Sequence, residues 1–169
     1  MPLSVIVTRA GPYDPISMAA IHRSCFAKAW DEAAMAQFLA SPETLCLVGS
    51  VADSTGMMGG LLIARKAADE AEILTFCVAP ACRNAGLGRA LLEMAVAELR
   101  AAGVKQLFLE VEEGNEPALK LYRSLGAVPI GRRERYYETG ADAAIFSLAL
   151  SDSRSDDGQI ADEPRENQR

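Results

Sequence analysis

The sequence predicts an α/β domain in which helices cover a mixed central sheet. Apolar periodicity indicates elements in the order β-α-α-β-β-β-α-β-α-β-β. Hairpin-like pairs of strands imply antiparallel neighbours, whereas the two helices that separate later strands imply crossover connections. At 169 residues, half of them apolar, the chain is long enough for one hydrophobic core of ordinary size. We therefore expect a single domain over residues 1–150.

Signals for a strand and two helices open the chain. Residues 4–9 alternate as a short strand, and Asp14-Pro15 supplies a helix N-cap followed by proline at the first helical position. That helix is predicted to run to about Lys28. A second helix opens at residues 30–32 and stops before Ser41-Pro42, because the residue before a proline avoids helical geometry.

Three β-like runs and a long helix follow. Residues 44–52 and 57–64 flank Asp53-Ser54-Thr55-Gly56, a sequence typical of a hairpin turn, and residues 72–78 form another apolar strand. A helix that starts near Gly88 carries a wide apolar stripe, with Gly103 as its C-terminal cap.

The last elements are a strand, a helix and two further strands. The strand covers residues 106–111, and the helix covers residues 116–125, with Gly126 just past its end. Residues 128–137 and 143–150 fit a final hairpin. Residues 151–169 hold six acidic residues and no aromatic one, so we expect a solvated tail that does not order itself.

The charge balance limits the class of partner. A formal net charge of -6 argues against direct nucleic-acid binding and favours a cationic partner. No apolar run approaches the roughly 20 residues that span a bilayer, and residues 1–5 lack the basic and apolar regions of an export signal. We expect a cytoplasmic protein without membrane contact.

Cysteine and histidine usage gives no sign of a metal site. The four cysteines are scattered without a Cys-x-x-Cys pair, at Cys25, Cys46, Cys77 and Cys82, and His22 is the only histidine. Because zinc needs three or four ligands at compatible spacing, we expect buried, reduced cysteines and no metal. His22 is predicted to be a packed or surface residue of a helix.

A glycine-containing turn at residues 83–90 stands between an apolar strand and an amphipathic helix. Glycines let the main chain approach a ligand, and the following helix directs unpaired amides and its positive dipole end at the turn. A phosphate-bearing cofactor is therefore expected. A P-loop requires Gly-Lys followed by Ser or Thr, which Gly88-Arg89-Ala90 lacks. A dinucleotide fold requires a third small residue where Leu91 stands.

The turn resembles the pyrophosphate loop of the GNAT N-acetyltransferases, Gln/Arg-x-x-Gly-x-Gly/Ala, which residues 83–88 match in full. The likeness extends to Leu109-Glu110-Val111, Asn115, Leu121-Tyr122 and the run at residues 132–137. These segments are similar to the bacterial ribosomal-protein-alanine N-acetyltransferase (RimI-like) branch over residues 4–150. The resemblance implies the GNAT fold, with about seven strands and four helices, and acetyl-CoA as co-substrate.

Glu110 and Tyr122 are the candidate catalytic residues. Glu110 shares a face with Phe108 on a strand expected to be largely buried, where apolar surroundings would make a carboxylate a better base. Pairing with an arginine at the strand end is equally compatible with the pattern. Tyr122 lies among leucines, as a core tyrosine would. The resemblance assigns Glu110 as the general base and Tyr122 as the acid toward the CoA sulfur.

The resemblance also implies the contacts of acetyl-CoA. A bulged strand end would offer the main chain of Phe76, Cys77 and Val78 to pantetheine and the acetyl oxygen, with the Cys77 thiol taking no chemical part. The pyrophosphate would be held by backbone amides from Asn84 to Arg89, within the cofactor-binding loop of Arg83, Asn84, Ala85, Gly86, Leu87, Gly88 and Arg89. Asn115 precedes a helix and is a helix N-cap, a contact to CoA, or both.

The resemblance says less about the residues that bind the acceptor amine than about those that bind acetyl-CoA. Tyr136 and Tyr137 suit an ordinary strand, and the resembling branch has such a pair beside its peptide cleft, so we expect them to contact substrate. Glu138 stands where that branch often has proline, which leaves the acceptor's identity open. An α-amine is the easier acceptor, because roughly 14% of it is neutral at pH 7 against ~0.04% of a lysine amine.

The implied function is transfer of acetyl from acetyl-CoA to the α-amine of an N-terminal alanine, on a basic small-subunit ribosomal protein. Two alternatives stay open. One is acetylation of a small amine such as a polyamine, an amino acid or an aminoglycoside. The other is a non-catalytic CoA-binding or regulatory module.

Overall fold

The computed structural model describes residues 3–11, 14–52, 57–137 and 140–151, and within them one mixed sheet of seven strands and four α-helices. The strands are β1 (Val5–Arg9), β2 (Thr44–Val51), β3 (Met58–Ala67), β4 (Glu70–Val78), β5 (Gln106–Glu112), β6 (Val128–Arg133) and β7 (Ala143–Ala149). The helices are α1 (Pro15–Cys25), α2 (Glu32–Ala40), α3 (Leu87–Ala101) and α4 (Glu116–Ser124), with a single 3-10 turn, η1 (Pro80–Cys82). The predicted fold class is confirmed.

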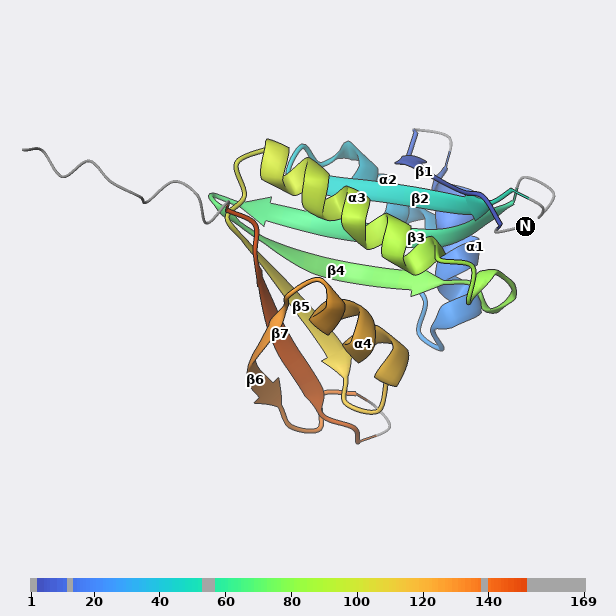
Figure 1. Cartoon of the computed structure of the whole chain (residues 1–169). Helices are drawn as coiled ribbons and strands as arrows, with labels where there is room; N and C mark the ends of the chain where they lie inside the picture. Colours follow the sequence, from blue (N-terminus) through green and yellow to red (C-terminus); the bar gives the residue numbers. More distant parts are fainter. Residues whose placement is uncertain (1–2, 12–13, 53–56, 138–139, 152–169) are drawn as a thin grey trace, which may run out of the picture.

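The sheet has the order β1-β2-β3-β4-β5-β7-β6. Strands β1, β2, β3 and β4 pair with one another antiparallel, and β7 lies antiparallel between β5 and β6. The parallel pair β4–β5 joins these two halves, but it is paired only from Glu70↔Gln106 to Glu72↔Phe108. Beyond these residues β4 and β5 diverge, so the sheet is open along one seam (Figure 1).

Helices cover the two faces of the sheet unequally. Helices α3 and α4 share one face, where Leu91, Leu107 and Tyr122 belong to a single core. Helices α1 and α2 cover the other face with a second core that includes Met18 and Ile63. That second core contains residues of β2, β3 and β4 and none of β5, β6 or β7 in the described chain. None of the helices described in the structure therefore covers the second face of the C-terminal half (Figure 1).

Glycines allow α3 to lie close to the sheet. A Cβ atom at Gly60 on β3 would lie 2.6 Å from Leu91 Cδ1, and one at Gly49 on β2 would lie 2.6 Å from Leu87 Cδ1. Real Cβ atoms do not approach neighbours this closely, so larger residues would push the helix away. This close packing fixes the position of the first turn of α3, and hence of the loop that precedes it.

The first predicted helix is shorter than expected and is capped differently. It ends at Cys25 rather than near Lys28, because Phe26 is extended (φ -131°, ψ 137°). Asp14 occupies the N-cap position, but its side chain makes no cap bond to the helix and instead accepts the Gly11 N–H at 2.8 Å. The predicted turn at residues 53–56 and the predicted tail beyond residue 151 lie outside the described residues.

Two strand boundaries also differ from the prediction. Strand β6 ends at Arg133 rather than at Tyr137, because Arg135 adopts φ +50° and donates its amide to Asp142 Oδ1 at 2.9 Å. The tyrosine pair therefore lies in the connection to β7 and not on a strand. Strand β4 begins at Glu70, two residues earlier than the apolar pattern suggests.

Candidate active site

The divergence of β4 from β5 leaves the last residues of β4 paired with β3 alone. Leu61 pairs with Cys77 and Leu62 with Phe76 on that side. The expected bulge is present, but it lies earlier than residues 76–78. The register shifts between Ile63↔Thr75 and Ala64↔Ile73, which leaves Leu74 as the extra residue. Both Leu74 and Thr75 consequently face α1.

The loop before α3 has the conformation of a main-chain anion site. Asn84 and Gly86 adopt positive φ, at +61° and +83°, and Gly86 is the N-cap of α3 without a side-chain cap bond. A Cβ atom at Gly86 would meet nothing within 4 Å, so the loop faces open space. The first amides of a 15-residue helix that has no side-chain cap favour a bound anion such as a diphosphate.

The arginine side chains of this loop are engaged elsewhere. Arg83 Nε donates to the Val78 carbonyl at 3.1 Å, which ties the loop to the end of β4. Arg89 pairs with Glu93 at 3.0 Å and donates to Ser124 Oγ at 2.7 Å, which ties α3 to α4. The prediction that main-chain amides of this loop hold the pyrophosphate uses neither arginine side chain, and the Leu87 side chain is buried in the core.

Glu110 lies on β5 on the same face as Phe108, as expected, but its surroundings are not apolar. Arg133 Nη1 lies 3.1 Å from Glu110 Oε1, and the Glu110 side chain is 29% exposed. Arg133 on β6 and Glu112 on β5 both pair with Ala143 on β7, so they lie in one row across the sheet. Glu110 is two residues before Glu112 on the same face of β5, which places it within reach of the long Arg133 side chain. Of the two arrangements that the sequence allowed, pairing with an arginine is the one observed.

Tyr122 lies in α4 on the opposite face of the sheet from Glu110. Its ring is buried between Phe76 and Phe146, with centroids 6.5 Å and 6.1 Å away. Burial raises the pKa of Tyr122, and the nearby phenol of Tyr137 raises it further. Its hydroxyl therefore keeps its proton at neutral pH. The two candidate catalytic residues flank the seam from its two sides.

The predicted tyrosine pair lies beside Glu110. The rings of Tyr136 and Tyr137 meet edge to face at 5.2 Å, and the Arg133 guanidinium lies 5.5 Å from the Tyr136 centroid. Tyr136 is 51% exposed, whereas Tyr137 is half-buried. Burial, and next the Glu110 carboxylate, raise the pKa of Tyr137 to about 12. Tyr137 is thus the phenol that lies near both Glu110 and Tyr122.

The structure shows one of the two roles predicted for Asn115, that of a helix N-cap. Its side chain accepts the Ala118 N–H at 3.3 Å and caps α4, the helix that carries Tyr122.

Sequence reasoning missed Arg132, which pairs with Glu113 at 2.7 Å and Asp142 at 2.6 Å and so fixes the connection between β6 and β7. The adjacent arginines of this run were the available signal.

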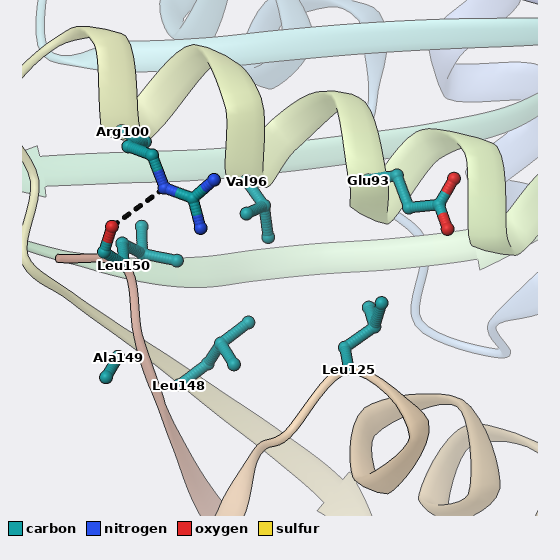
Figure 2. A pocket seen from close by; sticks show the side chains of 7 residues that line it. All are labelled: Glu93, Val96, Arg100, Leu125, Leu148, Ala149 and Leu150. Atoms are coloured by element: carbon teal, nitrogen blue, oxygen red, sulfur yellow. Dashed lines mark hydrogen bonds between the residues drawn. The ribbon is translucent and has the colours of Figure 1, made fainter. Parts of the chain in front are cut away.

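A pocket of about 200 Å³ lies away from these residues, between α3, α4 and the end of β7 (Figure 2). Arg100 crosses its rim and donates to the Leu150 carbonyl at 2.8 Å. No predicted site residue lines this pocket.

The described residues include no group of three or more His, Cys, Asp or Glu side chains placed to hold a metal ion. Among the helices described, none is long and apolar enough to cross a membrane.

Comparison with known proteins gives consistent matches. The [Ribosomal protein bS18]-alanine N-acetyltransferase of Escherichia coli K12 is 40% identical over 99 residues, covering 57% of this chain and 67% of that protein. The N-alpha-acetyltransferase RimI of Mycobacterium tuberculosis is 39% identical over 117 residues, covering 68% of this chain and 72% of that protein.

A solved structure extends the likeness to the whole described fold. The crystal structure of the ribosomal-protein-S18-alanine N-acetyltransferase from Escherichia coli superposes with a TM-score of 0.79 at 30% identity, covering 90% of this chain and 98% of that one. The family model described as "Acetyltransferase (GNAT) family" matches residues 16–127. The chain therefore belongs to the GNAT acetyltransferase family and is an N-acetyltransferase of the RimI type.

Proposed function

We propose that this chain is a protein N-terminal acetyltransferase that transfers acetyl from acetyl-CoA to the α-amine of an N-terminal alanine. The observation that carries the proposal is the combined sequence and structural likeness to the bS18-alanine N-acetyltransferase of Escherichia coli. The acceptor would be a basic small-subunit ribosomal protein, and the net charge of -6 supports such a partner.

Acetyl-CoA would bind along the open end of β4. It supplies the acetyl group as a thioester. The main chain of residues 84–89 would hold its diphosphate, which the positive φ of Gly86 and the uncapped N-terminus of α3 support. The last residues of β4, which have no partner on the β5 side, would bind the pantetheine arm through main-chain groups of Phe76, Cys77 and Val78.

The acceptor would approach from the face that carries Glu110, because α3 and α4 cover the other face. Tyr136 and Tyr137 would line this approach. Glu110 would take a proton from the attacking amine as the new nitrogen–carbon bond forms. Tyr122 would give its proton to the sulfur as the carbon–sulfur bond breaks. No acyl-enzyme is needed, so the Cys77 thiol would remain a bystander.

The test compares acceptors on the purified protein with acetyl-CoA. We expect thiol release and a mass gain of one acetyl group on a basic peptide that begins with alanine. The same peptide with a blocked N-terminus and an internal lysine should remain unmodified. Turnover only with a polyamine, an amino acid or an aminoglycoside would replace the proposal by small-amine acetylation. Acetyl-CoA binding without thiol release for any amine would indicate a binding module.

A further inference from the structure

His22 is a buried titratable side chain that the proposed proton transfers do not use. It lies on α1, is 4% exposed, and both of its ring nitrogens are bonded. Nδ1 accepts the Trp30 N–H at 3.1 Å, and Nε2 lies 3.1 Å from Thr75 Oγ1. Because Nδ1 accepts, the neutral ring carries its proton on Nε2 and donates it to the threonine hydroxyl. The imidazole thus links two separate segments of the chain.

The segments that His22 links are both close to the proposed reaction. Thr75 directly precedes Phe76 on β4, next to the extra residue of the bulge. Trp30 belongs to the connection between α1 and α2 at residues 26–31, which we call the α1–α2 loop. The Trp30 ring stacks on the imidazole at 4.9 Å with an interplanar angle of 11°. One side chain therefore sets the distance between this loop and the open end of β4.

The α1–α2 loop lies on the acceptor side of the sheet. Thr75 and Cys77 on β4 face α1. Glu72 points to the same face, because its neighbours Ala71 and Ile73 belong to the core on the opposite face. Its parallel partner Phe108 on β5, and Glu110 two residues further on, therefore also lie on the face of α1. Phe26 opens the loop, and its ring lies 4.5 Å from the imidazole while the residue remains 40% exposed. The loop thus presents an exposed aromatic ring on the face from which the acceptor would approach.

Resting on the proposed function, we propose that His22 is a positioning residue that holds the α1–α2 loop against β4 as one wall of the acceptor site. It would act on acceptor binding through Phe26 and Trp30 and would transfer no proton to or from substrate, because the ring is buried and its nitrogens face Trp30 and Thr75. Its removal should weaken binding of the acceptor in the ground state and the transition state alike. That pattern raises KM for the peptide and leaves kcat unchanged.

The test uses four variants. Thr75→Val removes the hydroxyl at nearly constant volume, His22→Ala removes both bonds, and His22→Gln can replace part of them. Ser24→Ala is the control on the same helix, because the Ser24 hydroxyl donates to the Ile21 carbonyl and touches neither segment. Trp30 is the only tryptophan, so its fluorescence reports the position of the loop without any activity.

We expect His22→Ala to raise peptide KM roughly tenfold and Thr75→Val about threefold, in line with lost buried hydrogen bonds. The kcat and the Kd for acetyl-CoA should stay within about twofold of wild type. His22→Gln should recover part of the loss, and Ser24→Ala should behave as wild type. Trp30 emission should shift to longer wavelength in His22→Ala, because the stacked ring becomes more exposed to water.

Three results would overturn the inference. Peptide KM could stay at the wild-type value in both Thr75→Val and His22→Ala, or kcat could fall at constant KM, which would give His22 a part in the chemistry. Unchanged Trp30 fluorescence in His22→Ala would show that His22 does not hold the loop. Failure of the proposed function is a separate outcome, seen as wild-type protein that does not acetylate the peptide. If His22→Ala does not fold, Thr75→Val carries the test.

Discussion

The guanidinium of Arg133 on the outermost strand β6 reaches across β7 and lies 3.1 Å from the carboxylate of Glu110 on β5. The two side chains are 55% and 29% exposed, so the pair contributes little to the stability of the fold. The pair instead orients the Glu110 side chain, because Arg133 holds one oxygen of its carboxylate toward β6. The residue proposed as the base is thus oriented by a strand that carries no other proposed catalytic group.

Arg133→Met should separate orientation from stability. We expect turnover to fall roughly tenfold, because a misdirected base reacts poorly. The free energy of unfolding should change by less than about 1 kcal/mol. Arg65→Met is the matched control, since Arg65 is about as exposed as Arg133 (53%) and pairs with a carboxylate, Glu72, between β3 and β4. Equal turnover in the two variants would contradict this role of Arg133.

Glu110→Gln and Tyr122→Phe should each slow turnover of an alanine-starting peptide while acetyl-CoA affinity is kept. Loss of a positioned acid or base typically costs 10²–10⁴-fold, and we expect about 100-fold for Glu110→Gln. Tyr122→Phe keeps the ring between Phe76 and Phe146, so the core stays packed. Steady-state kinetics and calorimetry measure the two quantities. Normal turnover in both variants would remove the assigned roles.

Gly86→Ala should weaken acetyl-CoA binding, and Gly103→Ala should not. Both glycines have nearly the same φ, +83° and +85°, and a Cβ atom at either would meet nothing within 4 Å. Each substitution should therefore destabilise the fold by a similar amount, about 1 kcal/mol. Only Gly86 lies in the loop proposed to bind the diphosphate, so only its variant should raise the Kd for acetyl-CoA, roughly fivefold. Equal Kd values would show that this loop does not bind the diphosphate.

His22 should make stability fall in mild acid. Burial lowers the pKa of His22 below the usual 6.5, so between these two values the unfolded chain binds more protons than the folded one. The free energy of unfolding should be constant above about pH 7 and decline as the pH falls below about 6.5.

His22→Gln should flatten that decline, which urea unfolding at several pH values can measure. Asp142 does not interfere, because its pKa is lowered from 3.8, first by the hydrogen bond from the Arg135 amide, and its contribution is lost only in stronger acid. A variant with the same slope as wild type would rule out His22 as the cause.

Local patterns were sufficient for most of the fold. The apolar stripe of α3, the glycine just past the end of α4, and the shared face of Phe108 and Glu110 on β5 depend on neighbours in the sequence, and all three elements are confirmed. The GNAT likeness rested on such local runs, above all on residues 83–88. Boundaries at Cys25 and Arg133 were missed, because the extended conformation of Phe26 and the hydrogen bond from Arg135 to Asp142 do not follow from a local pattern.

The arrangement around the seam could not be read from the sequence. The neighbour of Glu110 is Arg133, and their contact requires β7 to lie between β5 and β6. The bulge at Leu74 depends on the register with β3, which no local pattern encodes. His22 looked like an ordinary helical residue, because its partner Thr75 lies 53 positions away. Long-range pairing decided each of these.

In the proposed reaction, the thioester and the amine would reach one another through the seam between β4 and β5 and not along the surface of the sheet. Each substrate would have its own route in, and each product its own route out, so neither has to leave before the other can bind. A compound that imitates both at once would need a slim central linker between two bulky ends, one lodged beside α3 and the other beside Tyr136.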